Sequence, residues 1–165
     1  MKANRAGWRP LRREQLMFDP RHDPFALGAK LPEPTRCLAC GAVFARGRWR
    51  WGLTSADAHE TLCPACRRIS DDMPAGYVSL SGKFVASHGD EIIARMRNVE
   101  SREKAEHPLE RLMAIGRAPG GMLVKTTSIH LARAIGEALE DAYKGDLEFH
   151  YNHDEWLLRV QWSRD

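Results

Sequence analysis

The sequence has no long apolar run and few cysteines. No segment approaches the roughly 18 apolar residues that a membrane-spanning helix needs. The N-terminal segment "MKANRAGWRPLRREQ" is charged but is followed by no apolar stretch, so we expect no secretory signal. Only four of the 165 residues are cysteine. These shortages predict a cytoplasmic protein without membrane contact or structural disulfides.

Motifs of the common enzyme classes are missing as well. The segment "GRAPGGM" is rich in glycine but lacks the G-x-x-x-x-G-K-[ST] pattern of a phosphate-binding loop. The sequence contains no G-x-S-x-G nucleophile turn. The cysteines stand in two pairs that suit a metal, which leaves none as a nucleophile beside a histidine base. The sequence therefore predicts no catalytic residue and favours a binding protein over an enzyme.

Positive charge is concentrated in the first part of the chain. The net charge is +4 over residues 1–36, +3 over 37–68 and −4 over 69–165, which gives +3 in total. A basic front and an acidic back indicate that the front meets a polyanion such as nucleic acid. An uneven but merely solvated surface is the alternative interpretation.

Residues 1–36 are predicted to form a basic arm. Its five prolines block long helices and sheet ladders, and they are Pro10, Pro20, Pro24, Pro32 and Pro34. An arm of this kind is ordered only where it lies against something. We expect three of its arginines, Arg9, Arg12 and Arg13, to contact RNA phosphates.

The four cysteines form two identical pairs. The pair "CLACG" begins at Cys37 and the pair "CPACR" begins at Cys63, so the spacing is C-x2-C-x22-C-x2-C. Zinc takes four thiolates in tetrahedral geometry, and a C-x2-C turn brings two sulfurs to one ion. The spacing predicts a zinc module over residues 37–70, of ribbon or treble-clef type, in which the metal supplies the folding energy. The predicted ligands are Cys37, Cys40, Cys63 and Cys66.

Other interpretations of the cysteine pairs are weaker. Structural disulfides are rare in the cytosol. A thioredoxin-like redox protein needs one C-x2-C at the start of a βαβ unit, not two pairs around a polar loop. A catalytic zinc keeps one coordination position open, whereas four cysteines fill the site. We therefore expect one structural zinc ion as the cofactor.

Between the pairs lies the segment "ARGRWRWG". If this segment is a strand, Arg46, Arg48 and Arg50 line one face and the two tryptophans line the other. We expect the three arginines to contact RNA phosphates. Trp49 and Trp51 are expected to brace the hairpin against the zinc turns, with stacking on bases as the alternative.

Arg67 and Arg68 directly follow the last cysteine. Both are candidates for contact with RNA phosphates. A zinc ion with four thiolates is anionic, so a structural counter-charge beside the metal is the alternative role, and it applies most to these two arginines.

Residues 87–165 are predicted to form an α+β unit of order α-α-β-α-β-β, after a connector over 71–86. We expect an antiparallel or mixed sheet with the helices on one face. The expected elements are a short strand within 77–84, a helix capped by Ser87, a short helix from Pro108, a strand over 122–127, a helix from 129 that ends at Gly145, and strands over 146–151 and 156–162.

The apolar pattern of this unit also predicts its core. Residues at helical spacing form the buried stripe of the second long helix, namely Ile129, Ala132, Ile135, Leu139 and Ala142. Alternation in the final hairpin turns Phe149, Leu157 and Val160 toward that stripe.

A family resemblance accompanies these motifs. The segment "LVKTTSIHLARAIGEALEDAYKGDLEFHY", together with the two C-x2-C turns, resembles the nonsense-mediated mRNA decay protein 3 family. Archaeal and eukaryotic members of that family bind the large ribosomal subunit, and the eukaryotic ones serve as its export adaptor. The chain looks like a short prokaryotic relative, because it has fewer cysteines than the family and no counterpart of its downstream barrel-like domain. The resemblance covers roughly residues 37–150 and implies zinc ligation by the four cysteines and a ribosomal partner.

The sequence thus predicts a cytosolic, zinc-stabilised adaptor that binds structured RNA, with ribosomal RNA or the ribosome as the first candidate. Residues 87–165 would serve as a scaffold or as a docking surface for a protein. The alternative is a protein–protein adaptor without a nucleic-acid role, whose arginines face an acidic partner.

Overall fold

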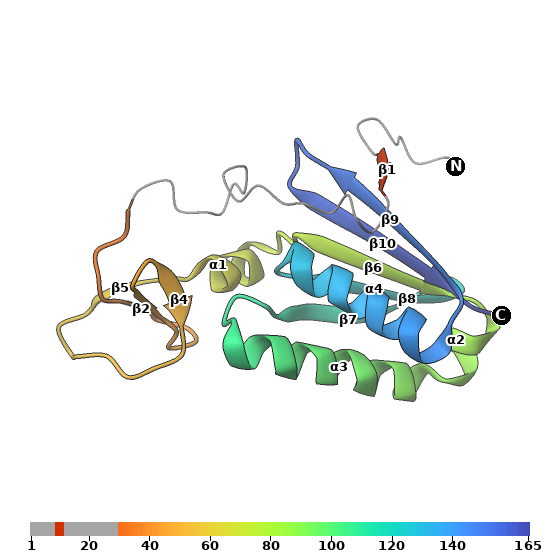
Figure 1. Cartoon of the computed structure of the whole chain (residues 1–165), viewed down its shortest axis with the longest axis horizontal. Helices are drawn as coiled ribbons and strands as arrows, with labels where there is room; N and C mark the ends of the chain where they lie inside the picture. Colours follow the sequence, from red (N-terminus) through yellow and green to blue (C-terminus); the bar gives the residue numbers. More distant parts are fainter. Residues whose placement is uncertain (1–8, 12–29) are drawn as a thin grey trace.

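Two separate sheets and four helices make up the part of the chain that is described, residues 9–11 and 30–165 (Figure 1). The structure is a computed structural model. A small cysteine module (residues 35–71) lies at one end of a larger sheet unit (residues 9–11 and 76–165). The fold class is mixed α+β, as the sequence predicts.

The cysteine module is built on a four-stranded sheet of order β4-β3-β2-β5. Its strands are β2 (Thr35–Cys37), β3 (Val43–Ala45), β4 (Arg48–Arg50) and β5 (His59–Thr61), and helix α1 (Pro64–Asp71) follows. Each strand has only three residues, so the sheet alone offers little apolar area to bury.

The sheet unit is a six-stranded mixed sheet of order β1-β9-β10-β6-β8-β7. Strand β10 pairs with β6 in parallel and with β9 antiparallel. The strands are β1 (Arg9–Leu11), β6 (Gly76–Ser81), β7 (Leu112–Ala118), β8 (Gly121–Thr126), β9 (Asp146–Asn152) and β10 (Leu157–Ser163).

Helices cover one face of the large sheet (Figure 1). Helix α4 (Ile129–Tyr143) lies on the sheet, α3 (Gly89–Glu106) packs beside α4, and the short α2 (Lys83–Ser87) joins β6 to α3. No helix in the described part of the chain lies on the opposite face. The predicted arrangement of helices on one side of a mixed sheet is therefore correct.

The ends and the buried face of α4 follow from its sequence. The Ser128 hydroxyl accepts hydrogen bonds from the N–H groups of His130 (3.0 Å) and Leu131 (3.4 Å), which makes it the N-cap. Gly145 follows the helix with φ +89°, a conformation that favours glycine. Four residues of the predicted stripe are buried, but Ala142 is exposed and Tyr143 takes the inward position.

In strand β10 the leucine that faces the core is Leu158, which is the neighbour of the predicted Leu157. Leu158, Val160 and Trp162 are buried against α4, whereas Leu157 is half-buried. Adjacent residues of a strand point to opposite faces, so this shift of one position decides which leucine packs inside. The prediction of Leu157 as a core residue is wrong, and those of Phe149 and Val160 are confirmed.

The second short helix expected from Pro108 does not form. Its place is taken by a turn, in which the Glu110 N–H donates to the His107 carbonyl (3.0 Å), followed by strand β7. The apolar run "LMAIGRA" is too short for its periodicity to separate helix from strand. This segment forms a strand because it pairs with β8 through the tight turn at Gly120.

The predicted connector over 71–86 holds two elements of the sheet unit. Strand β6 lies between β10 and β8, so the C-terminal part of the sheet unit begins at Gly76 rather than at 87. Ser87 ends α2 instead of capping α3, because its hydroxyl bonds back to the carbonyls of Lys83 (3.1 Å) and Phe84 (3.2 Å). The N-cap position of α3 is occupied by His88.

Candidate metal centre

The four cysteine sulfurs converge at the base of the cysteine module. All four Sγ atoms lie within 4.8 Å of one another, and none of the cysteines is in a disulfide. Cys37 ends strand β2 and Cys40 lies in the turn after it, whereas Cys63 and Cys66 stand at the start of α1. The pairing inferred from the spacing is therefore present in space.

Local sequence shapes both cysteine turns. In the first turn, the N–H of Cys37 donates to the carbonyl of Ala42 (2.7 Å), and Gly41 adopts φ +78°. In the second turn, Pro64 occupies the first position of α1. There Cys63 acts as the N-cap, because its Sγ accepts from the Cys66 N–H at 3.4 Å.

The sulfur positions fit a tetrahedral metal ion. A zinc–sulfur distance of about 2.3 Å implies sulfur–sulfur edges of about 3.8 Å in a regular tetrahedron. The Sγ atoms of Cys40 and Cys63 are 3.8 Å apart. Backbone N–H donors support the thiolate form, as at Cys37, whose Sγ accepts from the Cys63 N–H at 3.2 Å. Four sulfur donors would fill the coordination positions of a tetrahedral ion.

Arg111 closes the sulfur cluster from the side of the sheet unit. Its guanidinium donates to the Sγ atoms of Cys63 (3.1 Å), Cys66 (3.2 Å) and Cys40 (3.5 Å). The side chain is 8% exposed, and its Nε–H donates to the Pro108 carbonyl at 3.0 Å. A metal with four thiolates carries a charge of about −2, so Arg111 supplies a buried counter-charge beside it.

The backbone of Arg111 is fixed to the sheet unit by Thr127. The Arg111 N–H donates to the Thr127 Oγ1 (3.0 Å), and the Thr127 N–H donates to the Arg111 carbonyl (2.9 Å). The guanidinium is therefore held in place by groups outside the cysteine module. Sequence reasoning missed this contact, because Arg111 lies 45 residues beyond Cys66 and belongs to no metal-binding pattern.

Burial and hydrogen bonding act on the sulfur pKa values in opposite directions. Burial raises the pKa of Cys37, but N–H donors from Cys63, Cys40 and Ala39 outweigh it and lower the pKa to about 6. Burial dominates at Cys63 and Cys66, whose pKa values are raised. Burial also tends to lower the pKa of Arg111, yet its hydrogen bond to Cys66 and the other thiolates raise it, so the guanidinium stays charged.

A thin apolar layer surrounds the sulfurs. The half-buried ring of Trp49 packs against the cluster, with its centroid 5.6 Å from that of Phe44. Leu62 of the module and Leu109 of the sheet unit complete the layer. The predicted bracing role is thus confirmed for Trp49. Trp51 differs, since it is 38% exposed and its indole N–H donates to the Lys104 carbonyl in α3 (2.6 Å).

The arginines of "ARGRWRWG" do not form one row. Arg46 and Gly47 are the two turn residues of the β3–β4 hairpin, with φ values of 55° and 77°. A single strand through this segment is therefore wrong, and only Arg48 and Arg50 share a face of β4. The side chains of Arg46 and Arg48 are exposed, and neither makes an ion pair or hydrogen bond within the described chain. Arg50 is half-buried, and its Nε has no partner among the described residues.

The other predicted RNA contacts have different environments. Arg68 is 3% exposed and donates to the Met73 carbonyl (2.9 Å), so burial removes it from any RNA-facing surface. Arg67 is half-buried, with its Nε unpartnered within the described chain. Arg9 lies in β1, whose backbone alone is described, and Arg12 and Arg13 lie outside the described residues.

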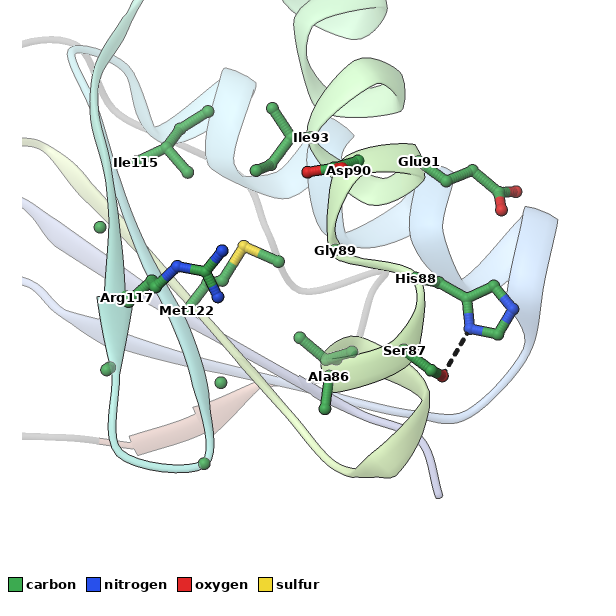
Figure 2. A pocket seen from close by; sticks show the side chains of 15 residues that line it. Ala86, Ser87, His88, Gly89, Asp90, Glu91, Ile93, Ile115, Arg117 and Met122 are labelled. Carbon is green, nitrogen blue, oxygen red and sulfur yellow. Dashed lines mark hydrogen bonds between the residues drawn. The ribbon is translucent and has the colours of Figure 1, made fainter.

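A cleft of about 650 Å³ lies away from the metal centre, between the α2–α3 junction and the β7–β8 hairpin (Figure 2). Asp90 and Arg117 point toward the cleft, whereas His88 points away from it. Ser87 Oγ lies 2.8 Å from His88 Nδ1, but the same hydroxyl also reaches two carbonyls at the end of α2. The Ser–His contact is therefore part of a helix end, where the His88 Nδ1 also lies 3.2 Å from the Phe84 carbonyl and its ring stacks on that of Phe84.

Comparison with models of known protein families, with curated proteins and with solved structures finds no match to this chain. The resemblance to the nonsense-mediated mRNA decay protein 3 family stays a prediction from motif and spacing. Among the described helices, none combines the length and the apolarity that crossing a bilayer requires.

Proposed function

We propose that the four cysteines hold one zinc ion and that the cysteine module presents its β3–β4 hairpin to structured RNA, with ribosomal RNA as the first candidate. The second cysteine pair comes from the start of α1 rather than from a second hairpin, which favours a treble-clef module over a ribbon. Zinc would supply the folding energy for the short strands and so fix the hairpin in place.

The observation that carries the RNA proposal is the tip of this hairpin. Arg46 and Arg48 are exposed there, and neither side chain forms an ion pair in the described part of the chain. One carboxylate lies at the turn, that of Glu33, which accepts from the Gly47 N–H at 2.8 Å. The net charge of +3 over residues 37–68 places the tip in a basic environment. Phosphate contacts of this kind position RNA without reading its sequence.

A double variant tests the RNA proposal. Arg46→Ser with Arg48→Ser should weaken binding of a stem–loop RNA and reduce the log–log salt slope by about 0.7–0.9 for each phosphate contact removed. Both residues are exposed, so metal content and thermal stability should stay unchanged. Arg117→Ser is the matched control, because it removes an exposed arginine of β7, outside the cysteine module. An unchanged salt slope in the double variant would refute the proposal.

The alternative, a protein–protein adaptor, has its own supporting observation. Large apolar side chains are exposed on and near the module, namely Leu38, Leu53, Ile69 and Met73. Exposed apolar residues of this size are common at protein interfaces when they form one patch. Co-purification separates the two functions, because bound RNA raises the 260/280 absorbance ratio and ribonuclease removes that excess.

A further inference from the structure

The face of the large sheet opposite its helices carries an ordered row of side chains. Tyr77 of β6 lies opposite Lys125 of β8 and opposite Arg159 of β10, and Arg159 lies opposite His150 of β9. Residues in register on neighbouring strands point to the same face. These four residues (the Tyr77 row) therefore run across four adjacent strands, over about 14 Å at the usual strand spacing.

The Tyr77 row faces away from the helices. On β10, the residues on either side of Arg159 are Leu158 and Val160, and both are fully buried beneath α4. Arg159 itself is exposed, and Tyr77 is half-buried. The guanidinium of Arg159 lies 5.1 Å from the centroid of the Tyr77 ring, so the two form a cation–π pair at the centre of the row.

Charge on this face changes along the strands. The Tyr77 row has two cationic side chains, and the Lys125 Nζ lies 3.2 Å from Asp72 at the end of α1. The next two rows contain Glu148 and Asp146 of β9, and the Glu148 Oε2 lies 4.0 Å from the Nε2 of His150 in the Tyr77 row. A polyanion would therefore follow the Tyr77 row across the strands and avoid the acidic end of the face.

We propose that the Tyr77 row binds a single-stranded RNA segment, whose bases stack on the Tyr77 ring and the Arg159 guanidinium while Lys125 and His150 contact its backbone. The proposal rests on RNA binding as the proposed function and adds a second surface to the hairpin. Single strands offer base faces to aromatic and guanidinium planes, whereas the stacked bases of a duplex are closed to them. An acidic peptide matches the charge of the row but has no base to stack.

Two RNA probes separate the row from the hairpin. The first is a fluorescein-labelled oligouridylate of about ten nucleotides, a length within the range that single-strand sites cover. The second is the stem–loop used for the hairpin variants. Tyr77→Ala should weaken oligouridylate binding about 5- to 150-fold, which corresponds to a stacking loss of about 1–3 kcal/mol. Its effect on stem–loop binding should be less than about twofold, within the scatter of a near-neutral change.

Further variants keep the test valid if Tyr77→Ala disturbs the central strand. Tyr77→Phe retains the ring and should bind nearly as the wild type, whereas Tyr77→Leu retains bulk and should bind as weakly as the alanine variant. Arg159→Gln should also weaken oligouridylate binding. Its matched control is Arg117→Gln, which removes an exposed arginine of the same sheet outside the row.

The outcomes distinguish this proposal from the proposed function. If the protein binds the stem–loop but not the oligouridylate, or if Tyr77 variants bind the oligouridylate as the wild type does, the proposal for the Tyr77 row is refuted. The proposal for the hairpin is unaffected by either result. If Arg159→Gln weakens binding but Tyr77→Leu does not, the row acts through charge alone and stacking is refuted. If the protein binds the oligouridylate in a way that depends on Tyr77 but does not bind the stem–loop, the proposal for the Tyr77 row is supported and the proposal for the hairpin is refuted. Absence of binding to both probes refutes both.

Discussion

The cysteine module and the sheet unit reach stability by different means. The sheet unit buries a continuous cluster of 21 apolar residues between its sheet and α2, α3 and α4. The corresponding cluster of the cysteine module has five buried residues, and three of these are cysteines. Apolar burial drives folding of the first, whereas we propose that sulfur–metal bonds stabilise the second. Short strands can therefore be held in place without a large core.

Arg111 connects the sheet unit to the cysteine module. It belongs to the sheet unit through Thr127 and Pro108, yet its charge is directed at the sulfurs of the module. Trp51 makes the reverse contact, because it belongs to the module and donates to the Lys104 carbonyl of the sheet unit. The two units are thus linked by hydrogen bonds that cross in opposite directions.

The largest expected effect comes from removal of a metal ligand. Cys63→Ser should abolish stoichiometric metal binding and unfold the module while the sheet unit stays folded, since structural zinc contributes about 10–16 kcal/mol of apparent folding energy in small modules. Amide chemical shifts in a two-dimensional NMR spectrum report the two units separately.

Treatment of the wild type with a chelator is the companion experiment. It should reproduce the spectrum of Cys63→Ser, and added zinc should restore the native spectrum only in the wild type. Disappearance of the sheet-unit signals in either sample would show that the folding of the sheet unit also depends on the metal.

Leu139→Ala should affect the opposite unit. Leu139 is fully buried in α4, so its truncation should reduce the free energy of unfolding by about 2–5 kcal/mol and leave the metal content unchanged. Leu157→Ala is the matched control, because truncation of this half-buried side chain should cost less. Denaturant unfolding provides the measurement, and equal destabilisation at the two leucines would contradict the observed register of β10.

Arg111→Met should loosen the connection between the units. The substitution removes the donors to the sulfurs, and we expect the free energy of unfolding to fall by about 1.5–3 kcal/mol, the usual contribution of a hydrogen bond to a charged group. Zinc transfer to a colorimetric chelator should become faster, and Arg117→Met should leave it unchanged. Unaltered transfer kinetics in Arg111→Met would mean that the guanidinium does not stabilise the metal site.

Trp51→Phe should have the smallest effect. It keeps an aromatic ring but removes the N–H that bonds to the Lys104 carbonyl, which should reduce stability by about 0.5–1.5 kcal/mol. Amide hydrogen exchange at the end of α3 should increase, with metal content unaffected. Slower or unchanged exchange there would show that the contact does not hold the helix end.

Local patterns are the predictable part of this molecule. Each C-x2-C pair forms within one turn, and Ser128 caps α4 through the N–H groups of His130 and Leu131, so short stretches of sequence contain the needed information. Arg111 is not predictable in this way, because only the fold brings it to the sulfurs. The sequence predicts β6 as a short strand, but its central place depends on partners β8 and β10 that come later in the chain.

The errors also have physical causes. A six- or seven-residue apolar run fits a helix or a strand equally well, which is why the sequence predicts a helix where β7 forms. The alternation around Arg46–Gly47 suggests a strand, although a glycine after a polar residue suits a two-residue hairpin turn. The charge of Arg68 suggests a surface position, but the turn of α1 directs its guanidinium to the Met73 carbonyl.

Native mass spectrometry of the intact chain, purified in reducing buffer, tests the central claim most directly. A metal-built cysteine module predicts one zinc ion per chain under native conditions and four free thiols after acid denaturation. A native mass without metal, or a denatured mass that shows disulfide formation among Cys37, Cys40, Cys63 and Cys66, would contradict it.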